Sequence, residues 1–306
     1  MSQNDLSLIE LLKKFPDDTT AEQWFVETRW PDGIECPHCE YDDIQLNSSH
    51  KTQPYRCRAC KRHFSVRVGT VLQGSRIGYQ KWAIAIYLLT SSPKGISSIQ
   101  LGKALGIPQK TAWYLAHRIR EGWREHQDLY DGPVEVDETY IGGRERNKHA
   151  DKKLRTGDGF DGKIPVVGAR DRNTGKVSMR VVEEADKTTL HNFIRLRVRN
   201  GSKVYTDGSY VYDDLNFVEH GKVIHSHGQY VDGDITTNSI ESVWAIVKRS
   251  YKGVYHYFSK KHLRRYVTEF QGRHNNKQAG TVERMTSLFR GMIDRRLKFD
   301  ELIKGG

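Results

Sequence analysis

Four cysteines have the number and spacing of a zinc site. They form two CxxC pairs separated by seventeen residues (40–56), and they are Cys36, Cys39, Cys57 and Cys60. Two such pairs can hold one Zn²⁺ tetrahedrally in a ribbon of short strands. His38 and His63 lie near the pairs, so three cysteines and one histidine are an alternative ligand set, although four cysteines suffice. We predict a structural Zn²⁺ here and a reducing, cytoplasmic location.

Three acidic residues, Asp137, Asp207 and Glu241, are candidates for a second metal site. Asp137 lies in the alternating segment Val134–Ile141, and Asp207 ends the short segment Lys203–Asp207, so both are expected on strands. Carboxylates are hard oxygen ligands that favour Mg²⁺ or Mn²⁺. Two such ions about 4 Å apart activate a water or a 3′-hydroxyl and stabilise the leaving oxygen of a phosphodiester. The acids therefore predict phosphoryl-transfer chemistry if the fold brings them together.

Glu241 lies on a predicted helix over Asn238–Arg249. Apolar residues at helical spacing give this helix one buried face: Ile240, Val243, Trp244 and Val247. Asn238, Glu241 and Lys248 share a second face. An acid and a base two turns apart suit a polyanion bound at a metal site, with Lys248 as a point charge near the scissile phosphate.

Each acid alone also has an ordinary explanation. Asp207 precedes Gly208, which is typical of a turn, and a helical glutamate such as Glu241 is usually solvated. Glu138 follows Asp137, but alternation along a strand directs it to the opposite face, so it is not expected to bind the same ion. The metal-site hypothesis therefore rests on all three acids together, because each lies in an element of the expected type and they follow one another in the expected order along the chain.

The elements before the acids indicate DNA binding. Two short helices are predicted over 4–15 and 20–29, ahead of the zinc ribbon. Further on, Ser97–Leu105, the turn Gly106–Pro108 and Gln109–Trp123 have a helix-turn-helix pattern, with an ordinary helical hairpin as the alternative. The exposed side of the second helix is expected to carry Lys110, Tyr114, His117, Arg118 and Arg120.

After Pro133 the pattern becomes that of an α/β domain. Strands are predicted at 134–141, 163–171, 176–183, 203–207 and 223–225, with a loop at 142–162 and a helix at 188–199. Two basic helices follow the acids, one over 259–276 with Arg264 and Arg265 and one over about 281–303. Strands, a helix, more strands and a final helix resemble the RNase H-like layout, a mixed sheet flanked by helices.

We therefore expect a multidomain chain of four segments. They are N-terminal helices with the zinc ribbon (1–70), a helix-turn-helix region (76–130), an RNase H-like catalytic domain (131–280) and a C-terminal basic helix (281–306). The 49 Lys and Arg residues exceed the 38 Asp and Glu residues, giving a net charge of +11, which favours an anionic partner such as nucleic acid. No apolar run approaches the roughly 18 residues of a membrane span, so we expect no membrane association.

Five stretches of sequence resemble one group of bacterial insertion-sequence transposases. They are CPHC…CRAC, EVDETYIGG, VYTDGSYVY, HSHGQYVDGDITTNSIESVWAIVKR and KKHLRRYVTEFQGRHNN. That group comprises DDE-type enzymes with a zinc ribbon ahead of an integrase-like core. The resemblance extends from about residue 20 to about residue 280. It implies an RNase H-like fold, two catalytic Mg²⁺ or Mn²⁺ ions, and cutting and strand transfer at element ends.

Matched by position, the resemblance implies that Asp137, Asp207 and Glu241 are the catalytic acids and Lys248 the basic residue. Asn238 precedes Glu241 by three residues and is the alternative third ligand. A carboxylate binds Mg²⁺ better than an amide, which favours Glu241. His225 also matches a family position, where it either binds phosphate or braces the loop.

The predicted partner is double-stranded DNA, both element ends and target, bound by at least a dimer because two ends must be held together. Predicted DNA-contacting residues are Lys110, Tyr114, Arg118, Arg249, Arg264 and Arg265. Two other functions fit the same residues. One is a domesticated transposase that binds DNA as a regulator, and the other is an RNase H-like nuclease without strand transfer.

Overall fold

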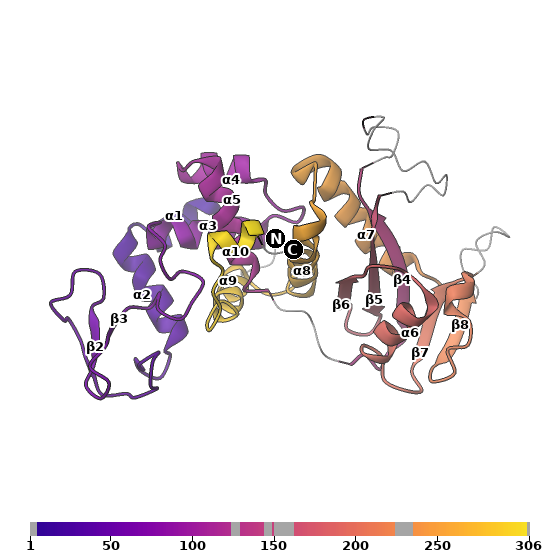
Figure 1. Cartoon of the computed structure of the whole chain (residues 1–306), viewed down its shortest axis with the longest axis horizontal. Coiled ribbons are helices and arrows are strands. Elements are labelled where there is room, and N and C mark those ends of the chain that lie inside the picture. The colour runs from indigo at the N-terminus through magenta and orange to yellow at the C-terminus, as the bar shows by residue number, and fades with distance from the viewer. Residues whose placement is uncertain (1–4, 124–128, 144–148, 150–161, 224–234, 305–306) are drawn as a thin grey trace. The chain divides into compact units, whose positions relative to one another are not determined.

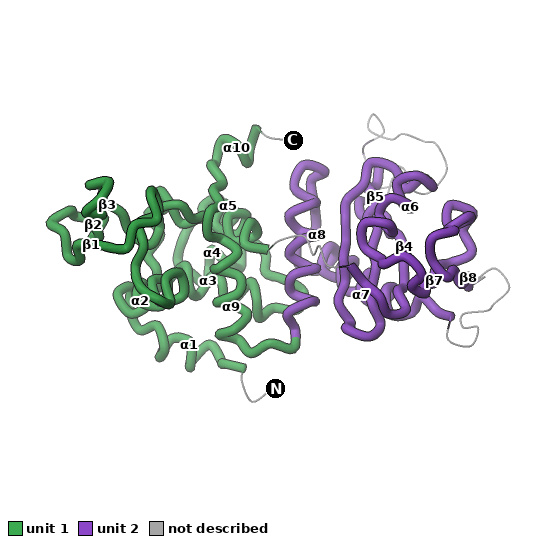
Figure 2. Tube along the Cα trace, turned by 90° about the horizontal axis from the view of Figure 1, so that it is seen from below, with its two compact units in different colours: residues 1–124, 278–306 green, residues 125–277 purple. Residues whose placement is uncertain are grey.

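A computed structural model of the 306-residue chain describes all residues except 1–4, 124–128, 144–148, 150–161, 224–234 and 305–306. The chain forms two compact units, shown in Figure 2. Unit 1 combines residues 1–124 with 278–306, and unit 2 consists of residues 125–277. The chain thus leaves unit 1, forms unit 2 and returns to complete unit 1. Within the described residues, no helix has the length and apolar character needed to cross a membrane.

Unit 1 consists mainly of helices around a core of aromatic side chains. Ser7 and Glu10 form a capping box at the first helix, and the Asp17 side chain caps the second. Phe25 and Phe289 are fully buried, and their rings meet edge to face at 4.6 Å between centroids. The helices are α1 (Leu8–Lys14), α2 (Asp18–Arg29), α3 (Tyr79–Ser91), α4 (Ser98–Leu105), α5 (Gln109–Arg120), α9 (Thr281–Arg290) and α10 (Phe299–Lys304).

The C-terminal segment, expected as one basic helix over 281–306, instead forms two helices that belong to unit 1. Helix α9 buries Met285, Leu288 and Phe289 in the core that it shares with α2 and α3. After α9 the chain pairs with the segment before α3, where Thr70 and Ile293 form a β-bridge. The apolar face of α9 packs against helices α2 and α3, which lie far away in the sequence. The periodicity of residues 281–306 alone cannot predict this packing.

Helices α4 and α5 form the pair expected of a helix-turn-helix. Gly106 ends α4 with a φ of 60°, in the left-handed region that glycine adopts without steric cost. Leu101, Leu105, Ala112 and Leu115 bury the inner faces of both helices in the same core as α1, α2 and α3. Segments 1–70 and 76–130 therefore share one hydrophobic core.

The zinc-ribbon segment is a small antiparallel sheet. Its strands are β1 (Ile44–Gln45), β2 (Tyr55–Cys57) and β3 (His63–Phe64), in the order β1-β2-β3. Only Cys36, Cys57 and Phe64 are buried there, so the segment has little hydrophobic core of its own.

Unit 2 contains a mixed five-stranded sheet in the order β6-β5-β4-β7-β8 (Figure 1). Its first three strands pair antiparallel, whereas β4, β7 and β8 are parallel. The strands are β4 (Val134–Ile141), β5 (Ile164–Asp171), β6 (Val177–Val181), β7 (Lys203–Asp207) and β8 (Glu219–Val223). This sheet confirms the predicted mixed α/β core. Most of the loop expected at 142–162 lies outside the described residues.

Helices cover both faces of this sheet. The helical elements are α6 (Lys187–Arg195), η3 (Tyr210–Tyr212), α7 (Asn238–Ser250), the π-helical turn η5 (Tyr251–Tyr255) and α8 (Lys260–Asn275). Adjacent residues of β5 serve opposite faces: Val167 packs with α6, and Val166 packs with α7 and α8. Trp244 and Val247 of α7 lie in the second cluster, as the helical periodicity predicts.

Side chains of α8 satisfy the backbone of the edge strand β6. The Gln271 side-chain oxygen accepts a hydrogen bond from the Met179 N–H at 2.7 Å. Asn275 accepts from the Val177 N–H at 2.8 Å and donates to the Val177 carbonyl at 2.9 Å. These amides take the place of a sixth strand and prevent β6 from pairing with another chain.

Replacing Gln271 by Leu should destabilise unit 2, because the buried Met179 N–H would lose its acceptor. We expect a loss of about 1–3 kcal/mol in the free energy of unfolding, measured by chemical denaturation. The matched control is Lys260→Ala, an exposed position at the start of the same helix. Equal stabilities of the two variants would show that the amide does not protect the edge.

Candidate active site

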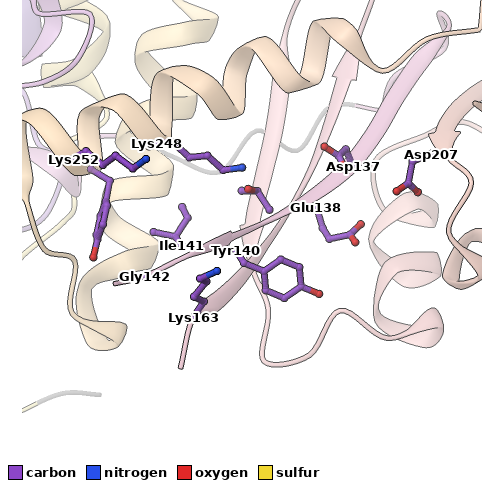
Figure 3. A pocket seen from close by; sticks show the side chains of 11 residues that line it. Asp137, Glu138, Tyr140, Ile141, Gly142, Lys163, Asp207, Lys248 and Lys252 are labelled. Atoms are coloured by element: carbon purple, nitrogen blue, oxygen red, sulfur yellow. The ribbon is translucent and has the colours of Figure 1, made fainter. Parts of the chain in front are cut away.

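The parallel pairing of β4 with β7 brings Asp137 and Asp207 to the same level. Val134 pairs with Val204 and Glu135 with Tyr205, and the ladder ends there. Continuing this register by two residues places Asp137 opposite Asp207. Both side chains line a cavity of about 410 Å³ (Figure 3). The remaining lining residues are Glu138, Thr139, Tyr140, Ile141, Gly142, Lys163, Lys248, Tyr251 and Lys252.

Asp137 is held by the apolar helix α7. The Trp244 indole Nε1 donates a hydrogen bond to Asp137 Oδ2 at 3.0 Å. Gly168 is the β5 partner of Asp137, and a Cβ atom at Gly168 would lie 2.6 Å from the indole ring. The absence of a side chain at Gly168 thus leaves room for the indole. Periodicity placed Trp244 on the buried face, but the hydrogen bond to Asp137 has no sequence signal.

Glu138 points to the other face of β4, as strand alternation predicts, yet it lines the same cavity. Its Oε2 accepts a hydrogen bond at 2.5 Å from the hydroxyl of Tyr212, a fully buried residue of η3. The cavity lies where β4 and β7 are no longer paired, so side chains from both faces of β4 reach it. The cavity therefore contains a third carboxylate that alternation alone had excluded.

The electrostatics of the cavity disfavour an unneutralised cluster of carboxylates. Burial, followed by the charges of Glu138 and Asp207, raises the pKa of Asp137 to about 7, and Glu241 adds to this effect. Burial also raises the pKa of Glu138, as does the charge of Asp207. A divalent cation would relieve this repulsion, and an all-oxygen donor set suits Mg²⁺ or Mn²⁺.

The N-terminus of α7 is fixed by Glu135, a fully buried residue of β4. Its carboxylate accepts hydrogen bonds from the Ile240 N–H and the Ser239 hydroxyl, both at 2.9 Å. Arg172 donates to the same carboxylate at 2.7 Å and to the Thr236 carbonyl at 2.8 Å. A negative charge at a helix N-terminus is favourable, so Glu135 sets where α7 begins. Sequence reasoning treated Glu135 only as part of the alternating pattern.

The predicted residues of α7 divide between the cavity and the solvent. Lys248 lines the cavity, whereas Asn238, Glu241 and Arg249 are exposed and do not belong to its lining. The Thr237 hydroxyl donates to Glu241 Oε1 at 3.0 Å. Glu241 nevertheless acts electrostatically on Asp137. His225 lies outside the described residues.

Two of the predicted DNA contacts on α5 are used inside unit 1. Arg118 is only 4% exposed, and it donates to the Gln73 carbonyl at 2.7 Å. Tyr114 is half-buried and donates to the Leu297 carbonyl at 2.7 Å. His117 and Arg120 are buried as well. The expectation that this side of α5 is exposed was therefore wrong beyond its first turn, because the segments around residues 73 and 297 cover it.

The other predicted DNA contacts lie on exposed or partly exposed surface. Lys110, in the first turn of α5, is exposed, and so is Arg264 of α8. Arg265 is half-buried. On α4 and α5, the exposed side chains thus lie in the first turn of α5 and on the outer face of α4.

The four cysteines converge as a zinc site requires. Their sulfur atoms all lie within 4.8 Å of one another, with Cys36 and Cys60 Sγ at 3.6 Å and Cys39 and Cys57 Sγ at 3.7 Å. Four sulfurs about 2.3 Å from a central Zn²⁺ would be about 3.8 Å apart in a regular tetrahedron. The cluster is therefore consistent with structural zinc bound by four cysteines, without a histidine.

Comparisons with known proteins match the regions of the chain that contain the acidic cavity and the four cysteines. Residues 130–275 match the ISXO2-like transposase domain, and residues 16–63 match the transposase zinc-ribbon domain. A protein of the transposable element ISH50 from Halobacterium salinarum is 30% identical over 275 residues, which cover 85% of this chain and 92% of that protein. The chain belongs to the family of ISXO2-like transposases.

As a member of this family, it is the transposase of an insertion element and a DNA-binding phosphoryl-transfer enzyme. Halobacterium salinarum is an archaeon, so a bacterial origin of this chain stays a prediction. A solved chain of the simian T-cell lymphotropic virus intasome, in complex with the PP2A regulatory subunit B56 gamma, has 13% sequence identity and a TM-score of 0.30. This likeness covers 61% of the transposase and 65% of that chain, and it is too loose to support a structural argument.

Replacing Glu135 by Ala should loosen the first turn of α7. The substitution removes three hydrogen bonds and leaves Arg172 without its buried counter-ion, which costs on the order of 3 kcal/mol. Amide hydrogen exchange should accelerate at Ile240 and its neighbours, and less so in Glu135→Gln, which keeps an acceptor oxygen. Glu219→Ala, an exposed glutamate on β8, is the control. Unchanged protection of Ile240 in Glu135→Ala would contradict the anchoring role.

Proposed function

We propose that this transposase binds the terminal repeats of its element and catalyses Mg²⁺-dependent cleavage and strand transfer there. The observation that carries the proposal is the juxtaposition of Asp137 and Asp207 on neighbouring parallel strands, lining one cavity together with Lys248. Carboxylates that face a phosphate without a metal would repel it. An acidic cavity in a DNA-binding protein is therefore best explained by bound cations.

In this proposal Asp137 and Asp207 hold two Mg²⁺ or Mn²⁺ ions. When bound, the ions activate the attacking water or 3′-hydroxyl and stabilise the leaving oxygen. The Trp244 indole orients the Asp137 carboxylate, so that one of its oxygens remains directed to the ions. Lys248 binds the scissile phosphate as a point charge.

Glu241 is the proposed third metal-binding residue, and Asn238 is the alternative. Glu241 is favoured because a carboxylate binds Mg²⁺ better than an amide does, and because Lys248 follows it by seven residues. Both residues lie in the first turn of α7, beside Ser239 and Ile240, which Glu135 anchors.

DNA recognition is proposed to involve both units. Lys110 at the start of α5 and the basic residues Arg249, Arg264 and Arg265 are the candidate contacts, and Zn²⁺ on the four cysteines supports the ribbon. Two element ends must be held together for strand transfer, so we propose at least a dimer on DNA. The catalytic segment is proposed to correspond to residues 131–280.

One experiment separates this proposal from the two alternatives. The full-length protein is incubated with labelled element ends, target DNA and Mg²⁺. Joined products support a transposase active in strand transfer, nicking without joining supports a nuclease, and intact bound DNA supports a regulator.

Within this assay Asp137→Asn should reduce product formation by at least about 10²–10³-fold, the scale of losing one electrostatic contact at the reacting group. DNA binding and folding should persist, because Asn keeps an oxygen for the Trp244 indole. Asp131→Asn is the matched control, since Asp131 is exposed and its ion pair with Arg199, at 3.8 Å, contributes little. Normal activity of Asp137→Asn would rule out this carboxylate as a metal ligand.

A further inference from the structure

The cavity has chemically different ends. Figure 3 shows the carboxylates of Asp137, Glu138 and Asp207 gathered at one end and Lys252 at the other. Lys248 and Lys163 lie between them in this view. Such a cavity combines a place where cations neutralise acids with a place where ammonium groups bind an anion.

The three lysines come from separate parts of the fold. Lys248 is on α7, Lys252 follows it by four residues in the π-helical turn η5, and Lys163 directly precedes β5. One helical turn advances about 5–6 Å along the axis, so Lys252 extends the basic surface beyond Lys248, away from Asp137. A π-helical turn adds a residue to the helical repeat and is frequent at functional sites.

Other contacts hold this turn in place. Tyr251 and Tyr255 each pack against Phe258, with ring centroids 5.2 Å apart. The Tyr255 hydroxyl donates to Glu269, a fully buried residue of α8, at 3.0 Å. The position of Lys252 beside the cavity is therefore built into the packing of unit 2.

We propose that Lys252, at the basic end of the cavity, and Lys163, between that end and the carboxylates, together bind one backbone phosphate of the DNA strand next to the scissile phosphate. This inference rests on the proposed function, in which Lys248 binds the scissile phosphate beside the cations that the carboxylates hold. The strand enters along α7, and Lys252 fixes which phosphate reaches the acids. Tyr140 and Tyr251 also line the cavity, where an aromatic ring can stack on an adjacent base.

The test measures binding without chemistry. A fluorescent duplex that carries the element's terminal repeat is titrated with the full-length protein in the Asp137→Asn background over a range of salt concentrations. Each phosphate contact contributes about 0.9 to the slope of log K against log salt concentration for duplex DNA. The double variant Lys252→Ala/Lys163→Ala should reduce this slope by about that amount, and each single variant by part of it, because both lysines bind the same phosphate. Lys203→Ala, exposed at the opposite end of β7 from Asp207, should leave it unchanged.

A second measurement locates the phosphate. Single methylphosphonate substitutions remove the charge of one phosphate at a time along the labelled strand. The substitution at the phosphate adjoining the cleavage site should weaken binding by the parent protein and have little further effect on Lys252→Ala. The inference would be overturned if every methylphosphonate weakened binding by Lys252→Ala as much as it weakens binding by the parent protein. It would also be overturned if the salt slopes of the Lys252 and Lys163 variants equalled that of Lys203→Ala.

The two proposals fail in different ways. If the protein with intact Asp137 joins no DNA but the lysine variants show the reduced salt slope, the phosphate site is supported and the strand-transfer proposal is wrong. If DNA is joined and both lysine variants have the same salt slope as Lys203→Ala, only the proposed phosphate site is wrong. A parent protein that does not bind the duplex would overturn both.

Discussion

One buried carboxylate connects the sheet of unit 2 to the helix that completes its site. Glu135 lies in β4 two residues before Asp137, and it accepts hydrogen bonds from the Ile240 N–H and the Ser239 hydroxyl in the first turn of α7 and from the guanidinium of Arg172. The same strand thus presents one carboxylate to fix the helix and the next one on that face to the cavity. Because Trp244 of α7 binds Asp137 in turn, the helix and the acid position each other.

The carboxylates of this site repel one another electrostatically. Asp137 and Glu138 are half-buried beside Asp207, and their raised pKa values show that the charged forms are disfavoured in the absence of cations. The fold tolerates this because Tyr212 and Trp244 donate hydrogen bonds to the two carboxylates. Divalent cations would relieve this repulsion, which is why we propose that the carboxylates bind them.

Sequence patterns predicted the parts of the fold in which the spacing of residues within one segment is enough to indicate its structure. Alternation placed Asp137 on a strand, helical periodicity placed Trp244 on the buried face of α7, and two CxxC pairs predicted the ribbon. Contacts between distant segments were not predictable in this way. The sequence predicts Arg118 to be an exposed cation of a DNA-binding helix. In the structure it is buried, and it donates a hydrogen bond to the carbonyl of Gln73 in a distant segment. In the sequence Glu135 looks like one more polar strand residue, because its partner Arg172 follows 37 residues later and its partners on α7 follow 104 and 105 residues later.

We propose above that Asp137 and Asp207 share divalent cations in one cavity. The most direct test of this proposal is a crystal structure of the protein with Mn²⁺, in which anomalous scattering locates the ions independently of the protein atoms. We expect Mn²⁺ peaks in the cavity, bound by Asp137 and Asp207, and a third ligand from the first turn of α7 that decides between Glu241 and Asn238. A cavity without an anomalous peak at saturating Mn²⁺, or ions bound by other residues, would contradict the proposal.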